Sequence, residues 1–116
     1  MSASPRQTPS ERAALGSHFL HVRVTGRVQG VGYRAFVRAT AHALGVVGWV
    51  CNHPDGSVEV VGQGPAAAIQ TLADALRRGP AGAWVADVEP LAAAVLDRAT
   101  SFEVRHAPPG LELRRG

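Results

Sequence analysis

The order of strand-like and helix-like segments is the feature that most narrows the folds open to this chain. Apolar side chains alternate in FLHVRVTG, where Leu20, Val22 and Val24 share one face, and this pattern predicts a half-buried strand. Further strand patterns occupy residues 46–52, 57–63, 84–91 and 101–106. The HPDG segment between the second and third strands is typical of a hairpin turn.

Two helices are predicted from residues that recur at helical spacing. The first follows the first strand, carries Phe36, Ala39, Thr40 and Ala43, and stops at Gly45. The second lies between Gly-Pro pairs at 64–65 and 79–80, with Ile69, Leu72 and Leu76 on one face. The resulting β-α-β-β-α-β order predicts an α+β, ferredoxin-like sandwich: two helices on one face of an antiparallel sheet, with a short extra C-terminal strand. Residues 92–100 fit either a loop or a helical turn.

Length and composition predict one packed domain. A chain of 116 residues, 46% hydrophobic and 18% charged, suffices for a single core. We expect the domain to span residues 18–107, between a flexible tail at 1–17 and a loose tail at 108–116. Residues 1–17 lack the apolar run of a secretory signal, and no stretch reaches the roughly 18 apolar residues of a membrane span. We therefore expect a cytoplasmic protein.

The side-chain inventory excludes several kinds of chemistry. Cys51 is the only cysteine, so an intrachain disulfide and a multi-cysteine metal site are impossible. All twelve cationic residues are arginines, which rules out a lysine Schiff base and a GxxxxGK[ST] phosphate loop. These arginines are scattered and form no basic tract for nucleic acid. The two tryptophans, Trp49 and Trp84, are expected to pack in the core or on the sheet.

No metal site is expected from the spacing of potential ligands. The five histidines form no HxxxH or HExxH pattern, so we expect them at the surface; they are His18, His21, His42, His53 and His106. Asp55 falls in a turn and Glu59 points outward from its strand, so no pair of carboxylates is indicated either. The sequence thus predicts an enzyme or binding site without metal or other cofactor.

The stretch GRVQGVGYR, residues 26–34, joins the first strand to the first helix. A dinucleotide-binding loop is disfavoured because the third glycine of GxGxxG falls at Ala35 and no acidic residue lies at the required distance. A tight turn alone would explain the glycines. Arg34 favours an anion site, because a cation in the first turn of a helix is unfavourable unless an anion lies beside it. Backbone N–H groups and a guanidinium together suit phosphate.

GRVQGVGYR followed by GWVCNHPDGSVEV resembles the two signature segments of the acylphosphatase family, over residues 19–106. The resemblance implies hydrolysis of the carboxyl-phosphate bond of an acyl phosphate without a metal or organic cofactor. It implies that Arg34 binds the phosphate and Asn52 positions the attacking water. The implied phosphate cradle is the backbone of Gln29, Gly30, Val31, Gly32, Tyr33 and Arg34.

Two residues depart from the family pattern. Cys51 stands where a basic residue commonly precedes the asparagine, and strand alternation predicts that it faces away from Asn52 and packs as a small apolar side chain. Tyr33 replaces the commoner Phe, and only its backbone is expected to face the phosphate. Without the resemblance, Asn52 would be interpreted as a turn residue before HPDG.

The competing interpretation is a non-catalytic ferredoxin-like module that binds an anion or RNA, because one fold hosts many functions. An RNA-binding version would carry exposed aromatic residues on its central strands, where this sequence offers only Phe19. We therefore expect a monomeric enzyme whose partner is a small-molecule acyl phosphate, with no nucleic acid or membrane partner. The sequence does not specify the acyl group.

Overall fold

The computed structural model describes residues 17–92 and 99–106. Residues 1–16 and 107–116, which hold almost all of the two predicted tails, lie outside the described residues. Residues 93–98 also lie outside the described residues, so the prediction of a loop or a helical turn at 92–100 falls mostly on residues that the structure does not describe.

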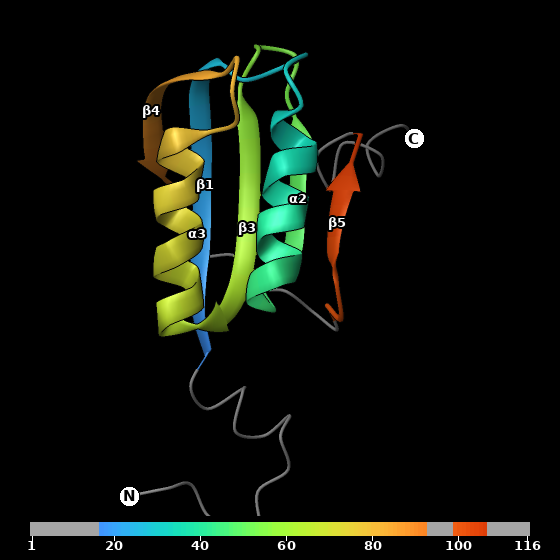
Figure 1. The fold of residues 1–116 in the computed structure, drawn as a ribbon, viewed down its shortest axis with the longest axis vertical. Helices are drawn as coiled ribbons and strands as arrows, with labels where there is room; N and C mark the ends of the chain where they lie inside the picture. The colour runs from blue at the N-terminus through green and yellow to red at the C-terminus, as the bar shows by residue number, and fades with distance from the viewer. Residues whose placement is uncertain (1–16, 93–98, 107–116) are drawn as a thin grey trace, which may run out of the picture.

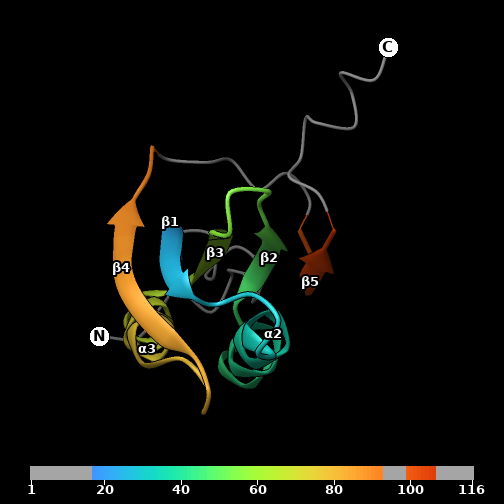
Figure 2. The ribbon, with the colours of Figure 1, turned by 90° about the horizontal axis from the view of Figure 1, so that it is seen from above.

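Within the described ranges, five strands form one sheet in the order β4-β1-β3-β2-β5 (Figures 1 and 2). They are β1 (Ser17–Arg27), β2 (Val47–Asn52), β3 (Val58–Pro65), β4 (Trp84–Pro90) and β5 (Phe102–Arg105). The first four pair antiparallel, as predicted, while the short β5 runs parallel to β2, so the complete sheet is mixed. Helices α2 (Tyr33–Leu44) and α3 (Ala66–Arg78) lie on the same side of this sheet (Figure 2). The predicted ferredoxin-like α+β fold is confirmed.

The core lies between the sheet and the two helices. Leu20, Val22 and Val24 of β1 point into it, and Leu72 and Leu76 of α3 cover them. Burial of such side chains stabilises the fold by about 1.5–3 kcal/mol each. A second, smaller cluster of Trp49, Cys51 and Val61 forms apart from this core. Because side chains alternate along a strand, this cluster belongs to the sheet face away from the helices.

Two packing details differ from the sequence prediction. The buried face of α2 is formed by Tyr33, Val37 and Ala41, one position away from the face that Phe36 and Thr40 indicated. Trp84 is 66% exposed, so the expectation that it packs in the core or on the sheet was wrong. It is the first residue of β4, an edge strand that has a neighbour on one side only. Trp49, in contrast, is only 8% exposed, as expected.

Two connections meet at one end of the sheet, and they position the candidate site. The segment 28–32 leads from β1 into α2, and the segment 53–57 is the turn between β2 and β3 (Figure 1). Neither α2 nor α3, the helices of the described ranges, has the length and apolar character that a membrane crossing requires.

Candidate active site

The loop before α2 has a backbone shape that glycine alone adopts readily. Gly30 and Gly32 have φ angles of 74° and 79°, in the left-handed region. A Cβ at either position would meet no atom within 4 Å, so the backbone conformation, and not crowding, calls for glycine. Successive N–H groups in such a conformation form a concave binding surface for anions.

The start of α2 carries positive charge that no acidic side chain of residues 17–92 and 99–106 offsets. Gly32 is the N-cap, no side chain caps the helix, and its first turn holds no acidic residue. The first N–H groups of a helix have no partner within the helix. Arg34 adds a guanidinium there, and among the described residues no carboxylate lies within ion-pair distance of it. The helix start and Arg34 therefore both attract an anion.

One hydrogen bond fixes the Arg34 side chain across the sheet edge. Its Nη1 donates to the backbone oxygen of Arg105 in β5 at 3.1 Å. A guanidinium has five N–H donors, so this contact leaves others available. The short fifth strand thus holds the arginine in place.

Asn52 is the last residue of β2, and its side-chain oxygen has no hydrogen-bond donor among the described residues. This Oδ1 atom is buried. Buried polar atoms of this kind nearly always have a partner, commonly a water molecule. Asn52 is thus suited to hold a water.

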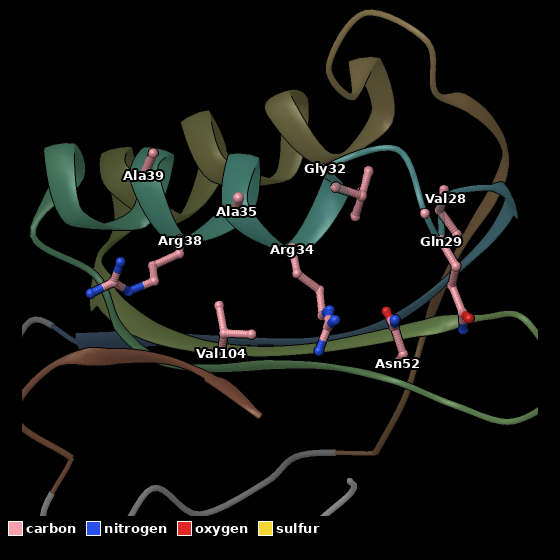
Figure 3. Close-up of a pocket in the computed structure, with 11 residues that line it drawn as sticks. Val28, Gln29, Gly32, Arg34, Ala35, Arg38, Ala39, Asn52 and Val104 are labelled. Carbon is pink, nitrogen blue, oxygen red and sulfur yellow. The ribbon is translucent and has the colours of Figure 1, made fainter. Parts of the chain in front are cut away.

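These residues share one cavity of about 360 Å³. It is lined by Gln29, Gly30, Gly32, Tyr33, Arg34 and Asn52, together with Val28, Ala35, Arg38, Ala39 and Val104. Figure 3 shows Arg34 reaching from the start of α2 toward the strands, with Asn52 beside its tip. The predicted site residues are thereby brought together, except Val31, which packs against the core instead of lining the cavity.

Gln29 has a role that the sequence did not reveal. Its Nε2 donates to the backbone oxygens of His53 and Ser57, each at 2.8 Å. This amide ties the loop before α2 to the β2–β3 turn and so fixes the loop relative to Asn52. Sequence reasoning placed Gln29 in the cradle but had no signal for a contact between two separate connections.

Tyr33 and Arg38 also line the cavity. The Tyr33 hydroxyl is buried and donates to the backbone oxygen of Leu76 at 2.7 Å. Burial raises the pKa of this phenol well above its ordinary value, so Tyr33 stays neutral and anchors α2 to α3. Arg38 was not singled out from the sequence, although its spacing of four residues from Arg34 places both on one helix face.

Cys51 lies among residues different from those around Asn52, as alternation predicted. It is fully buried with Trp49 and Val61. Burial, reinforced by the Glu59 carboxylate, raises the pKa of the Cys51 thiol to about 11. The thiol therefore stays protonated near neutral pH and is no nucleophile in this environment.

Potential metal ligands come together in space although their spacing in the sequence did not indicate it. Ligand atoms of Cys51, His53 and Glu59 lie within 4.8 Å of one another. The side chains of His21 and His53 are each 17% exposed, so the expectation that these two lie at the surface was wrong. They are drawn inward by Glu59, which contacts both.

Comparisons with known proteins agree with the sequence resemblance. The family model for acylphosphatase matches residues 20–104. The acylphosphatase of Rhizobium meliloti is 43% identical over 109 residues, covering 94% of this chain and 99% of that protein. The acylphosphatase of Rhizobium etli is 53% identical over 70 residues, covering 60% and 74%. The crystal structure of acylphosphatase from Bacillus subtilis has a TM-score of 0.71 and 34% identity, covering 76% of this chain and 98% of that one.

Fold and similarity together define a small α+β hydrolase domain. The chain belongs to the acylphosphatase family, and it is an enzyme that hydrolyses acyl phosphates. The competing interpretation, a non-catalytic module, is therefore set aside.

Proposed function

We propose that the loop of residues 29–34 and Arg34 bind the phosphoryl group, and that Asn52 positions the attacking water. One observation supports this most directly: the buried acceptor of Asn52 lines the same cavity as the guanidinium of Arg34, which has no carboxylate partner among the described residues. An anion satisfies the guanidinium and the loop N–H groups, and a water satisfies the amide oxygen. The two ligands are then neighbours, as hydrolysis requires.

The proposed step is an in-line displacement at phosphorus. Asn52 Oδ1 accepts a hydrogen bond from the water, so that a lone pair of the water oxygen is directed at the phosphorus atom. The new P–O bond forms as the bond to the acyl oxygen breaks, and the carboxylate leaves. The acyl phosphate dianion and water give a carboxylate and dihydrogen phosphate, because both protons of the water stay with the phosphate.

This chemistry needs little help from a general acid or a metal. A carboxylate is a stable leaving group, so fixing the phosphoryl oxygens and orienting the water are the main requirements. Arg34 and the loop N–H groups supply positive charge around the equatorial oxygens. We propose a metal-independent, monomeric, cytoplasmic enzyme whose partner is a small-molecule acyl phosphate, without a nucleic acid or membrane partner.

Hydrolysis in the presence of a chelator tests this proposal. Purified protein is treated with excess EDTA, dialysed into chelator-treated buffer, and assayed with benzoyl phosphate. We expect turnover equal to that of the untreated protein, and competitive inhibition by inorganic phosphate. Residual metal is measured in the same sample. Loss of activity that one divalent ion restores would contradict the proposal.

A further inference from the structure

A cluster of polar side chains gathers away from the candidate active site. Glu59 of β3 pairs with Cys51 of β2 on one side and with Arg23 of β1 on the other. Its Oε1 lies 2.6 Å from Nε2 of His53, and its Oε2 lies 2.5 Å from Nε2 of His21. The side chain of Glu59 is only 14% exposed, and Cys51 is fully buried. None of these residues lines the cavity that holds Arg34 and Asn52.

The contacts of His21 and His53 fix the position of the Glu59 carboxylate. Nδ1 of His21 lies 2.5 Å from the backbone oxygen of Ala92, and its Nε2 contacts Oε2 of Glu59. Nε2 of His53 contacts the other carboxylate oxygen. The two imidazoles therefore hold the carboxylate at both of its oxygens, close to the thiol of Cys51.

We propose that Cys51, His53 and Glu59 form a zinc site on this face of the sheet. Thiolate, imidazole and carboxylate are the ligand types that zinc takes in proteins. Ligand atoms around one tetrahedral zinc ion lie about 3.3–3.6 Å apart, from ordinary Zn–S, Zn–N and Zn–O lengths. The three atoms here lie within 4.8 Å, so small side-chain rotations suffice.

The charges at the cluster also suit a divalent cation. A Cys51 thiolate and a Glu59 carboxylate neutralise the two charges of zinc, and a bound metal deprotonates the thiol. Two nearby arginines contact carboxylates outside the cluster, although Nε of Arg23 is buried without a hydrogen-bond partner among the described residues. Arg23 lies 3.8 Å from Asp55, and Arg105 lies 3.4 Å from Glu103 with its guanidinium 5.6 Å from the centre of the Trp49 ring. The contact of His21 with Oε2 of Glu59 resembles the outer contacts that orient carboxylate ligands in metal sites.

Zinc at this site would join β2 and β3 next to the active-site cavity. Glu59 belongs to β3, Cys51 to the end of β2 and His53 to the turn that follows, so Cys51 and His53 flank Asn52 in the sequence. The backbone oxygen of His53 also accepts the hydrogen bond from Gln29. The ion would therefore stabilise the β2–β3 turn without touching the phosphoryl group.

Cobalt(II) is the probe that tests the site, because a cobalt–thiolate bond absorbs in the near ultraviolet. Metal-free protein is titrated with Co²⁺, and its thermal midpoint is measured with and without Zn²⁺. We expect a saturable charge-transfer band, and a rise in Tm of about 10 °C at a hundredfold excess of zinc over its Kd. Cys51→Ala should abolish the band, and Glu59→Gln and His53→Gln should weaken cobalt binding by at least about tenfold.

The control is His42→Gln, which changes a histidine of α2 outside the cluster and should leave cobalt affinity unchanged. Circular dichroism of each metal-free variant establishes that it is folded, and Glu59→Gln keeps the proposal testable if Cys51→Ala does not fold. Absence of the band in the wild type would overturn the proposal. Equal binding by wild type and Glu59→Gln would also overturn it. Acyl phosphate hydrolysis by the metal-free protein is assayed separately, so either proposal can fail alone.

Discussion

Replacing Arg34 with Ala should lower kcat/KM for benzoyl phosphate by about 10³-fold or more, the scale on which arginines act in phosphoryl transfer. In the site we propose, the guanidinium contacts the phosphoryl oxygens before and during the displacement, so turnover and phosphate binding should both suffer. The inhibition constant of inorganic phosphate should therefore rise together with the loss of kcat. Steady-state kinetics with phosphate as the inhibitor measures both effects.

A second variant at position 34 separates charge from geometry, and a variant at Arg77 serves as the control. Arg34→Lys keeps the positive charge but loses the planar pair of donors, so its activity should lie between those of wild type and Arg34→Ala. Arg77→Ala removes an exposed arginine from the last turn of α3, away from the cavity, and should behave like wild type. If Arg34→Ala retains wild-type kcat/KM and phosphate affinity, the phosphate does not bind where we propose.

Replacing Asn52 with Ala should lower kcat by about 10²-fold, or roughly 3 kcal/mol, the scale for losing one oriented catalytic hydrogen bond. Phosphate affinity should stay close to wild type, because in the site we propose the amide contacts the water and not the phosphate. Stability should hardly change, since the buried Oδ1 has no donor among the described residues. Kinetics combined with thermal unfolding of the same sample checks all three expectations.

Asp55→Ala is the matched control, because Asp55 is a turn residue with a structural role. Its Oδ1 accepts hydrogen bonds from the backbone N–H and the hydroxyl of Ser57, at 2.9 and 2.6 Å. This variant should lower Tm and leave kcat near wild type. If Asn52→Ala instead loses stability and keeps full turnover, Asn52 is a turn residue and another group positions the water.

Local patterns in the sequence predicted most of the fold. Alternation placed Leu20, Val22 and Val24 in the core, and Gly-Pro pairs bounded α3. The pattern of α2 did not resolve which of two adjacent faces packs, because the helix is rich in alanine and an alanine suits either face. Trp84 was misplaced because a strand pattern does not say whether a strand lies at the edge of the sheet.

The sequence predicted those features of the candidate site that lie within a single segment, but not the contacts between segments. Arg34 stood out because a cation in the first turn of a helix needs an explanation, and Asn52 was identified through the family resemblance. The link from Gln29 to the β2–β3 turn depends on how two connections meet in space. The cluster around Glu59 depends on the pairing of three strands, and no HxxxH, HExxH or multi-cysteine pattern in the sequence indicated it.

Titration of ¹⁵N-labelled protein with inorganic phosphate tests most directly whether the loop and Arg34 bind the phosphoryl group. The backbone amide signals of Gly30 to Arg34 should shift with one saturable Kd that equals the inhibition constant of phosphate. In Arg34→Ala the same signals should shift only at much higher phosphate concentration. Loop signals that stay unchanged at saturating phosphate, while phosphate still inhibits hydrolysis, would contradict the account.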